Sequence, residues 1–264
     1  MPELAEVEYF RRRWDPGIGG RTLKLFLNTR NRIFRGTNTR ALRQHLTHAR
    51  LLGSEGRGKR MLFRFSGDNW LGIHLGMTGK LRIESAEFSP QKHDHLVLYQ
   101  PERALVFSDS RQFGRARFHH GRVPPEWWNS DVPEIASAAF DRTFFDRFLE
   151  RHSKAPIKAV LLMQSGFSGI GNWMADEILW RAKVLPSKRT QSLNAKERDA
   201  IFRAARFVAR ESMRYMAPDL ADPPRGWLIH ERWRTDGKCP RHATLLCRAT
   251  IGGRTTAWCP KCQR

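Results

Sequence analysis

The first residues of the chain combine an amine and an acid that suit covalent chemistry on a sugar. Pro2 is followed directly by Glu3. Removal of Met1, which we expect, would make Pro2 a secondary α-amine, and α-amino groups titrate near ~8 and are partly unprotonated at neutral pH. Such an amine condenses with an aldehyde to a cationic iminium, and Glu3 can transfer protons beside it. Met-Pro openings also arise simply because small second residues permit methionine removal, so the pair needs support from elsewhere.

The last residues have the spacing of a metal site. Cys239, His242, Cys259 and Cys262 form the pattern C-x2-H-x16-C-x2-C, which predicts one structural zinc ion held tetrahedrally. Cys247 is the alternative fourth ligand, although its distance from Cys239 suits a two-residue knuckle less well. Because all the cysteines cluster near this end, a disulfide framework is not indicated.

The charge of the chain points to a polyanionic partner. The 264 residues include 47 Lys and Arg against 26 Asp and Glu, which gives a net charge of +21. Nucleic acid fits this excess better than a membrane surface, because no run of about 18 apolar residues is present. The start lacks a signal-peptide pattern, and we expect a cytoplasmic protein, nucleoid-associated if bacterial.

The positions of these groups depend on elements of two kinds. A helix over 4–14 is followed by alternating segments that predict strands over 60–65, 71–75, 95–99 and 104–107. A proline-rich stretch at 123–133 resembles a linker. Beyond it, helical periodicity appears at 144–149, 157–161, 174–179 and 195–216, and two short strands are expected after Trp227.

Three turns present candidate nucleic-acid contacts. Lys59 follows glycine just before a strand and can approach a phosphate, while Met77 lies between glycines in the segment that begins at His74. Arg111 and Phe113 lie after a strand and could enter a base stack, since an inserted aromatic compensates for unstacking. Each of these residues, taken alone, is more often a solvated turn or a packing residue.

A glycine-rich connection leads to Asn172. Residues 164–172 contain three glycines between two expected helices, which permits two tight turns. The pattern predicts backbone amides exposed at a helix start, where they bind phosphate, with the Asn172 side chain as a further donor. An ordinary glycine-rich loop is the alternative.

With these motifs in chain order, the sequence resembles the formamidopyrimidine-DNA glycosylase and endonuclease VIII family of base-excision repair enzymes over nearly its whole length. The opening matches the family's Pro-Glu-Leu-Pro-Glu-Val except that Ala5 replaces a proline. The other matching segments are Gly58-Lys59, His74–Met77, Asp109–Gly114, Gln164–Asn172 with Asp176-Glu177, and Arg254 before Cys259.

The resemblance implies an α+β multidomain fold. An amino-terminal helix and β-sandwich catalytic domain would occupy residues 1–122, with an interdomain linker at 123–137. A helix-two-turn-helix domain would occupy 138–226, and a β-hairpin zinc finger 227–264. The implied partner is damaged DNA. We expect no association with a membrane, and we expect the protein to be a monomer.

The resemblance also assigns roles. Pro2 would attack C1′ of an everted damaged nucleotide and Glu3 would assist ring opening, after which the iminium would drive β- and then δ-elimination. Lys59 and Arg254 would bind phosphates flanking the lesion. The resemblance therefore places both residues among the catalytic residues and among the DNA contacts. The further DNA contacts are Met77, Arg111, Phe113, Asn172 and His74.

Three departures from the family pattern are present, and the mildest is the zinc pair Cys239 and His242, because imidazole replaces a thiolate without changing the coordination number. Ser110 stands where the family often has proline, which would loosen the turn that aims Arg111. The segment from Met216 to Trp227 is short where members that act on oxidised purines carry a longer capping loop. Oxidised purine and oxidised pyrimidine therefore both stay possible substrates. Duplex, bubble and single-stranded DNA also all stay possible. A noncatalytic DNA-damage- or structure-binding protein of the same fold is the alternative function.

Overall fold

The computed structural model describes residues 2–30, 32–129 and 132–264. These residues form two compact units. The N-terminal unit comprises residue 2 and residues 6–129, and the C-terminal unit comprises residues 3–5 and 132–264. Helix α1 (Leu4–Arg12) is therefore shared, because its first two residues belong to the C-terminal unit and the rest to the N-terminal unit.

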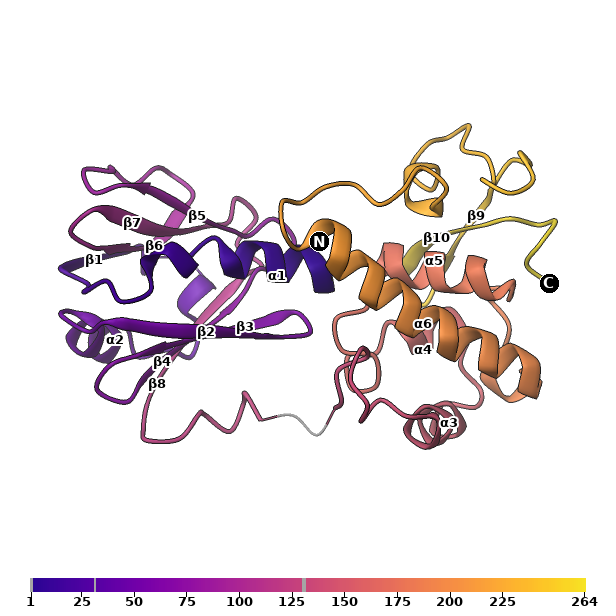
Figure 1. Cartoon of the computed structure of the whole chain (residues 1–264), viewed down its shortest axis with the longest axis horizontal. Coiled ribbons are helices and arrows are strands. Elements are labelled where there is room, and N and C mark those ends of the chain that lie inside the picture. Colours follow the sequence, from indigo (N-terminus) through magenta and orange to yellow (C-terminus); the bar gives the residue numbers. More distant parts are fainter. Residues whose placement is uncertain (1, 31, 130–131) are drawn as a thin grey trace. The chain divides into compact units, whose positions relative to one another are not determined.

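The N-terminal unit is a sandwich of two four-stranded antiparallel sheets (Figure 1). One sheet has the order β1-β6-β7-β5, and its strands are β1 (Lys24–Leu27), β5 (Lys80–Ser85), β6 (Asp94–Tyr99) and β7 (Arg103–Ser108). The other has the order β2-β3-β4-β8, and its strands are β2 (Leu51–Arg57), β3 (Arg60–Phe65), β4 (Asn69–His74) and β8 (Arg115–His120).

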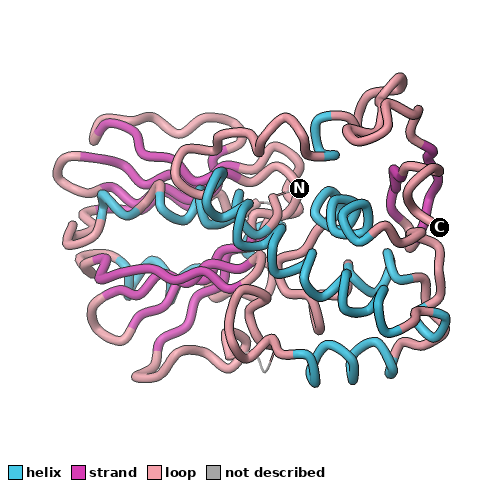
Figure 2. The backbone as a smooth tube through the Cα atoms, turned by 45° about the vertical axis from the view of Figure 1, so that its right-hand side comes forward, coloured by secondary structure: helices cyan, strands magenta, loops and turns pink. Residues whose placement is uncertain are grey.

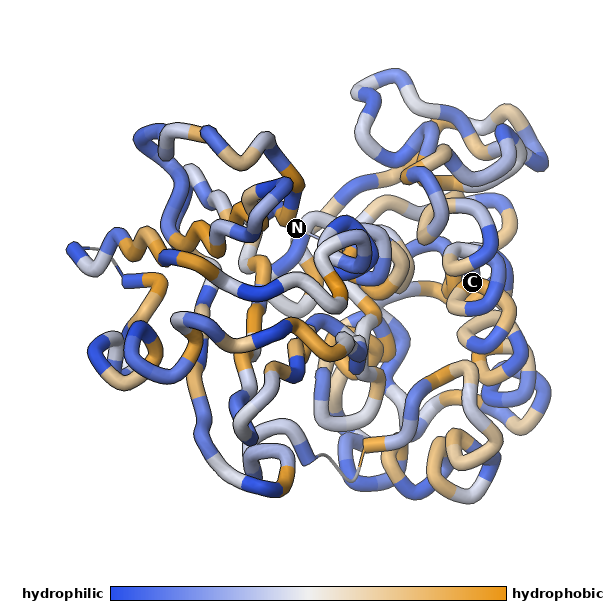
Figure 3. The backbone as a smooth tube through the Cα atoms, turned by 60° about the vertical axis from the view of Figure 1, so that its left-hand side comes forward, coloured by the Kyte–Doolittle hydropathy of each residue, from blue (hydrophilic) through white to orange (hydrophobic). Residues whose placement is uncertain are grey.

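Alternate residues of the strands face the core of the sandwich. On β3, Met61, Phe63 and Phe65 are fully buried in this core, whereas Arg64 between them is exposed. Figure 3 shows hydrophobic and hydrophilic residues interspersed along the backbone. Helix α2 (Thr39–Leu46) begins where the Asn38 side chain accepts a hydrogen bond from the Ala41 amide at 3.0 Å.

The C-terminal unit is mainly helical, as the cyan segments of Figure 2 show. Its helices are α3 (Arg142–Arg151), α4 (Ile157–Leu161), α5 (Asn172–Ala182) and α6 (Ala195–Met216). Asn194 and Glu197 form a capping box that starts α6. Aromatic and aliphatic side chains from these helices form one core, to which Ala5 of α1 also belongs.

The end of the chain is a β-hairpin made of β9 (Cys247–Ile251) and β10 (Arg254–Trp258). A small separate cluster lies beneath it, made of Trp180, Leu228, Cys239, Leu246, Ala257 and Cys259. Single-turn 3₁₀ helices lie at Asp15–Gly17, Arg32–Phe34, Thr190–Ser192 and Leu228–His230. Within the described residues, no helix has the length and apolar character needed to cross a membrane.

The predicted fold class is confirmed, with differences in detail. The first helix ends at Arg12 rather than Trp14, because a 3₁₀ turn begins at Asp15 and carries Pro16. The two short strands expected after Trp227 are β9 and β10, which both lie between His242 and Cys259. The proline-rich stretch packs on the sandwich through Trp128, which is 1% exposed. The division into segments ending at 122, 137 and 226 stays a prediction.

Candidate active site and nucleic-acid interface

Glu3 is held at the amino end of α5. Its carboxylate accepts hydrogen bonds from the backbone amides of Gly171, Trp173 and Met174 at 3.0, 3.0 and 3.1 Å, and its side chain is buried. These donors and the positive end of the helix dipole stabilise a carboxylate there. An acid placed in this way stays in one position beside Pro2, its neighbour in the chain.

The glycine-rich connection is shaped to receive Glu3. A side chain at Gly171 would overlap the Glu3 carboxylate, so this position requires glycine. The Leu4 amide donates to the Gly169 carbonyl at 3.1 Å, and the Gln164 side chain bonds the backbone of Gly169 and Ile170. The prediction that the amides at this helix start bind phosphate is therefore wrong, because the Glu3 carboxylate occupies three of them.

Asn172 lies at the first position of α5 and is half-buried. Its side-chain nitrogen donates to the Thr255 carbonyl of β10 at 2.9 Å. Because an amide nitrogen carries two hydrogens, one donor is left for a further acceptor. The structure thus connects Asn172 to the terminal hairpin within the C-terminal unit.

A buried ion network supports the same helix. Lys158, which is fully buried, donates to the Asn172 carbonyl at 2.7 Å and to the Asp176 carboxylate at 2.5 Å. Arg232 donates to the other Asp176 oxygen, with its Nε at 3.0 Å. Burial lowers the pKa of Lys158, and the Asp176 carboxylate opposes this shift. These three charges fix the register of α4, α5 and the segment before the hairpin.

Arg254 is exposed at the start of β10, directly after two glycines with positive φ. A side chain at Gly252 would come within 2.8 Å of Ala159 Cβ, so the tip of the hairpin lies close against α4. This approach fixes the backbone from which Arg254 extends.

The predicted metal ligands come together. One ligand atom each from Cys239, His242, Cys259 and Cys262 lie within 4.8 Å of one another. His242 Nδ1 is 3.5 Å from Cys239 Sγ and 3.8 Å from Cys259 Sγ. A tetrahedral zinc ion with its usual bond lengths requires sulfur and nitrogen ligands ~3.6 Å apart.

The ionisation of these ligand atoms also favours a bound cation. Burial, the neighbouring Cys259 thiol and the charge of Cys239 raise the pKa of Cys262 to about 12. Burial opposes ionisation of Cys239 too, but donors led by the Trp180 indole N–H, 3.3 Å from the sulfur, hold the pKa of Cys239 below its ordinary value. A group of this composition could hold a metal ion. Cys247 lies outside the group, on β9, where it pairs with Trp258.

In the N-terminal unit, Lys59 lies in the two-residue turn between β2 and β3. Gly58 before it has φ 58°, as a tight hairpin that begins with glycine requires. His74 ends β4, opposite Arg60 of β3. Burial and the positive charges of Lys59, Arg35 and Arg60 lower the pKa of His74. Its Nδ1 accepts the Gly76 amide at 3.1 Å, so in the neutral ring Nε2 carries the proton.

The two loops that carry Met77, Arg111 and Phe113 are joined through Asp109. This buried carboxylate accepts the Thr78 hydroxyl at 2.5 Å, the Arg111 amide at 3.2 Å and the Gly114 amide at 2.7 Å. The turn expected to be loosened by Ser110 is therefore anchored by its neighbour. Phe113 is 52% exposed beneath the Arg111 guanidinium, which lies 5.1 Å from the ring centre.

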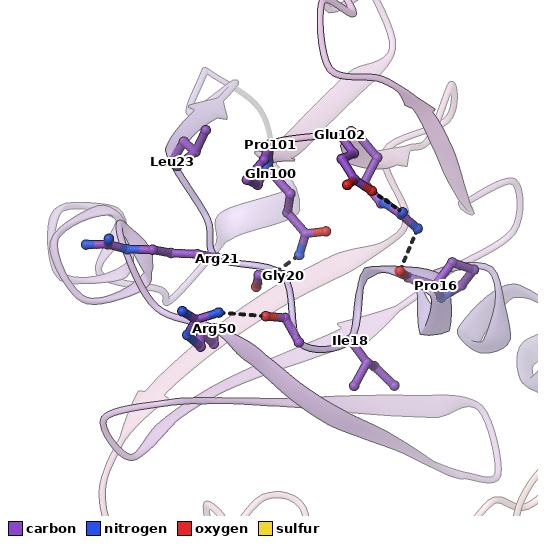
Figure 4. Close-up of a pocket in the computed structure, with 11 residues that line it drawn as sticks. Pro16, Ile18, Gly20, Arg21, Leu23, Arg50, Gln100, Pro101 and Glu102 are labelled. Atoms are coloured by element: carbon purple, nitrogen blue, oxygen red, sulfur yellow. Dashed lines mark hydrogen bonds and ion pairs between the residues drawn. The ribbon is translucent and has the colours of Figure 1, made fainter.

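A separate cavity of about 510 Å³ lies in the N-terminal unit beside Gln100 (Figure 4). Its polar groups bond one another, because Arg50 donates to the Gly19 carbonyl and Arg103 to the Pro16 carbonyl. The predicted site residues do not line it.

The structure thus groups the predicted residues by unit. The N-terminal unit holds Pro2, Lys59, His74, Met77, Arg111 and Phe113, and the C-terminal unit holds Glu3, Asn172, Arg254 and the four metal ligands. Asp109, Lys158 and Arg232 were not predicted as site residues. Their roles are hard to recognise in the sequence, because the residues that an acid between two loops or a lysine in an apolar helix contacts are distant along the chain.

Comparison with known proteins agrees with this geometry. Residues 1–116 match the family model for the formamidopyrimidine-DNA glycosylase N-terminal domain, and residues 132–219 match the H2TH domain of the same enzymes. The formamidopyrimidine-DNA glycosylase of Thermus thermophilus is 35% identical over 277 residues, which cover 100% of this chain and 98% of that protein. The chain belongs to the formamidopyrimidine-DNA glycosylase family. The Carboxydothermus hydrogenoformans member is 30% identical, with 100% of both chains covered.

Solved structures of the family superpose over the whole chain. The Lactococcus lactis enzyme bound noncovalently to DNA with an AP site has a TM-score of 0.86 and 29% identity, with 99% of each chain covered. The same enzyme with DNA containing an oxidised pyrimidine has a TM-score of 0.88 and 28% identity, with 100% of both chains covered.

Proposed function

We propose that this chain is a bifunctional DNA glycosylase and AP lyase of base-excision repair that removes oxidised bases and then cleaves the strand. The observation that carries the proposal is the placement of Glu3. In a chain of this family, the acid next to Pro2 is held by three backbone amides at the start of α5.

The reaction begins at the amine of Pro2, once Met1 is removed. This nitrogen attacks C1′ of the damaged nucleotide, and the bond from C1′ to the base breaks as the base leaves and takes a proton from water. The Glu3 carboxylate accepts the proton that the Pro2 nitrogen loses and passes it to O4′ as the sugar ring opens, which yields the iminium. Loss of a C2′ proton then expels the 3′-phosphate and a second elimination expels the 5′-phosphate, after which water releases Pro2.

DNA is bound by side chains of both units. Lys59, Asn172 and Arg254 contact phosphates, with His74 as a further donor through Nε2. Met77, Arg111 and Phe113 fill the space of the everted nucleotide, which offsets a flipping cost of a few kcal/mol. The shared anchoring of their loops by Asp109 supports joint insertion.

The metal group takes one zinc ion with a structural role. All four positions of a tetrahedral site would be filled by Cys239, His242, Cys259 and Cys262, which leaves none for substrate. Zinc there would hold the hairpin and Arg254 in position. We further propose that the protein acts on damaged DNA as a monomer.

Borohydride trapping tests the proposal. The protein is incubated with duplexes that carry an abasic site, an oxidised guanine or an oxidised pyrimidine, and the covalent adduct is measured. We expect wild-type adducts on the abasic duplex and on one class of oxidised base, and a loss of at least about 100-fold in Pro2→Gly and Glu3→Gln. Glu87→Gln, an exposed acid of the N-terminal unit, is the matched control.

Tight binding by the wild type without an adduct on any duplex would favour the alternative, a noncatalytic damage-binding protein. The class of oxidised base that gives an adduct would decide between purine and pyrimidine substrates. Intact mass of the trapped protein checks Met1, because its retention on active protein contradicts the role of Pro2.

A further inference from the structure

The outer face of the sheet β2-β3-β4-β8 carries a cavity ringed by arginines. The cavity has a volume of about 210 Å³ and is bounded by Arg35, Arg60, His74, Arg115, Arg117 and Trp127. We call Arg35, Arg60, Arg115 and Arg117 with this cavity the arginine pocket.

The sheet register forces these charges together. His74 on β4 lies opposite Arg60 of β3 and Arg115 of β8, and Gly72 lies opposite Arg117. Arg60 on β3 and the arginines of β8 thus lie on one face on either side of β4, where their like charges repel one another. Burial and then the charges of Arg115, Arg60 and Arg35 lower the pKa of Arg117, which reflects the same repulsion.

Carbonyl groups hold three of the four guanidinium groups in place without neutralising them. Arg35 donates to the Gly114 carbonyl at 2.7 Å, Arg60 to the Trp127 carbonyl at 2.5 Å, and Arg115 to the Arg35 carbonyl at 3.1 Å. Throughout residues 2–30, 32–129 and 132–264, no ion pair joins any of the four arginines to a carboxylate. Arg115 Nε is buried without a hydrogen-bond partner.

The Trp127 ring forms one side of the pocket, which lies close to two loops. A side chain at Gly72 would overlap the Trp127 ring, so glycine lets the indole lie against the sheet, with the Arg117 guanidinium 5.0 Å from its centre. His74 leads into the loop of Met77, and Arg115 follows the loop that is anchored by Asp109. The pocket therefore lies at the base of both loops.

We propose that the arginine pocket, together with Nε2 of His74 at its edge, binds a phosphate group of the DNA backbone, in addition to the phosphates contacted by Lys59, Asn172 and Arg254. Guanidinium groups fixed in advance match the geometry of phosphate oxygens and bind them in pairs of hydrogen bonds. The inference rests on the proposed function, because it assigns a further contact to the same DNA.

The salt dependence of duplex binding tests it. We compare wild type with Arg117→Gln and Arg60→Gln, and use Arg40→Gln, an exposed arginine of α2, as the matched control. Loss of one phosphate contact flattens the slope of log affinity against log salt by about 0.9. Between about 50 and about 200 mM salt, each pocket variant should therefore lose about 3.5-fold less affinity than wild type.

A second readout separates a binding role from a folding defect. Because Arg117→Gln removes a repelled charge, its melting temperature should equal or exceed that of wild type while its slope is reduced. Arg117→Lys keeps the charge and should keep most of the slope. Slopes equal to wild type in both glutamine variants would overturn the proposal.

A measurement with inorganic phosphate distinguishes a pocket that binds a phosphate of the DNA backbone from one that binds free phosphate. If phosphate raises the melting temperature of wild type but not of Arg117→Gln, while the DNA slopes are unchanged, the pocket takes free phosphate and the DNA assignment is wrong. Reduced slopes support the assignment whether or not phosphate binds. Borohydride trapping by wild type is scored separately, so failure of the proposed function is recognised by the absence of any adduct.

Discussion

Gly171 decides whether Glu3 can occupy the start of α5. In Gly171→Ala, the new methyl group would overlap the Glu3 carboxylate, which must then leave one or more of its three amides. We expect at least about a tenfold loss of trapping rate and a destabilisation of about 1–3 kcal/mol. Trapping kinetics and thermal unfolding measure the two effects. Gly226→Ala, where an added carbon meets no atom within 4 Å, is the control and should match wild type.

The Glu177 carboxyl should make stability depend on pH. Burial raises the pKa of Glu177 to about 7 from 4.5, although Arg181 and the Leu228 amide oppose the shift. Between these values the native state holds more protons than the unfolded state. The contribution of Glu177 is therefore full below pH 4.5 and falls by about 3 kcal/mol as the pH rises to about 7.

Glu177→Gln provides the measurement, because glutamine can still accept the Leu228 amide but does not titrate. Urea unfolding of both proteins from acid to neutral pH gives their difference in stability. We expect wild type to lose about 3 kcal/mol relative to the variant across this window. Parallel pH profiles would show that Glu177 does not titrate in it.

At the scale of elements, the hairpin of β9 and β10 depends on its ligand set. We expect wild type, His242→Cys and Cys247→Ser each to hold about one zinc ion per chain, because a thiolate can replace imidazole and Cys247 lies outside the cluster. His242→Ala should bind zinc at least about 100-fold more weakly and lose DNA affinity through Arg254. Zinc content and duplex binding check both, and zinc loss in Cys247→Ser would point to that cysteine instead.

Elements with local signals were predictable from the sequence. Helix α6 has the predicted bounds although its many arginines weaken its apolar pattern, and in the structure Asn194 with Glu197 caps its start. Strand β2 was missed because its sequence, LLGSEGR, contains two glycines and does not alternate. The pairing of Lys158 with Asp176 and Arg232 could not be predicted, because it joins residues 18 and 56 positions apart.

At the scale of the whole molecule, the chain path puts the two proposed catalytic neighbours in different units. Pro2 belongs to the N-terminal unit and Glu3–Ala5 to the C-terminal unit, where Ala5 is buried in the helical core. Residues Glu3–Ala5 are thus a structural part of the C-terminal unit, and Pro2 directly before them is the proposed nucleophile.

Glu3→Ala should therefore loosen the C-terminal unit selectively. The change leaves the buried amides of Gly171, Trp173 and Met174 without their acceptor, and each unsatisfied donor costs about 1–3 kcal/mol. By hydrogen exchange and mass spectrometry, we expect peptides from α4 and α5 to exchange at least about tenfold faster, while peptides from β3 and β4 keep their rates. Glu87→Gln should change neither set. Equal acceleration in both units would mean that Glu3 stabilises the whole chain rather than the helix start, and unchanged exchange in α5 would show that another group satisfies its amides.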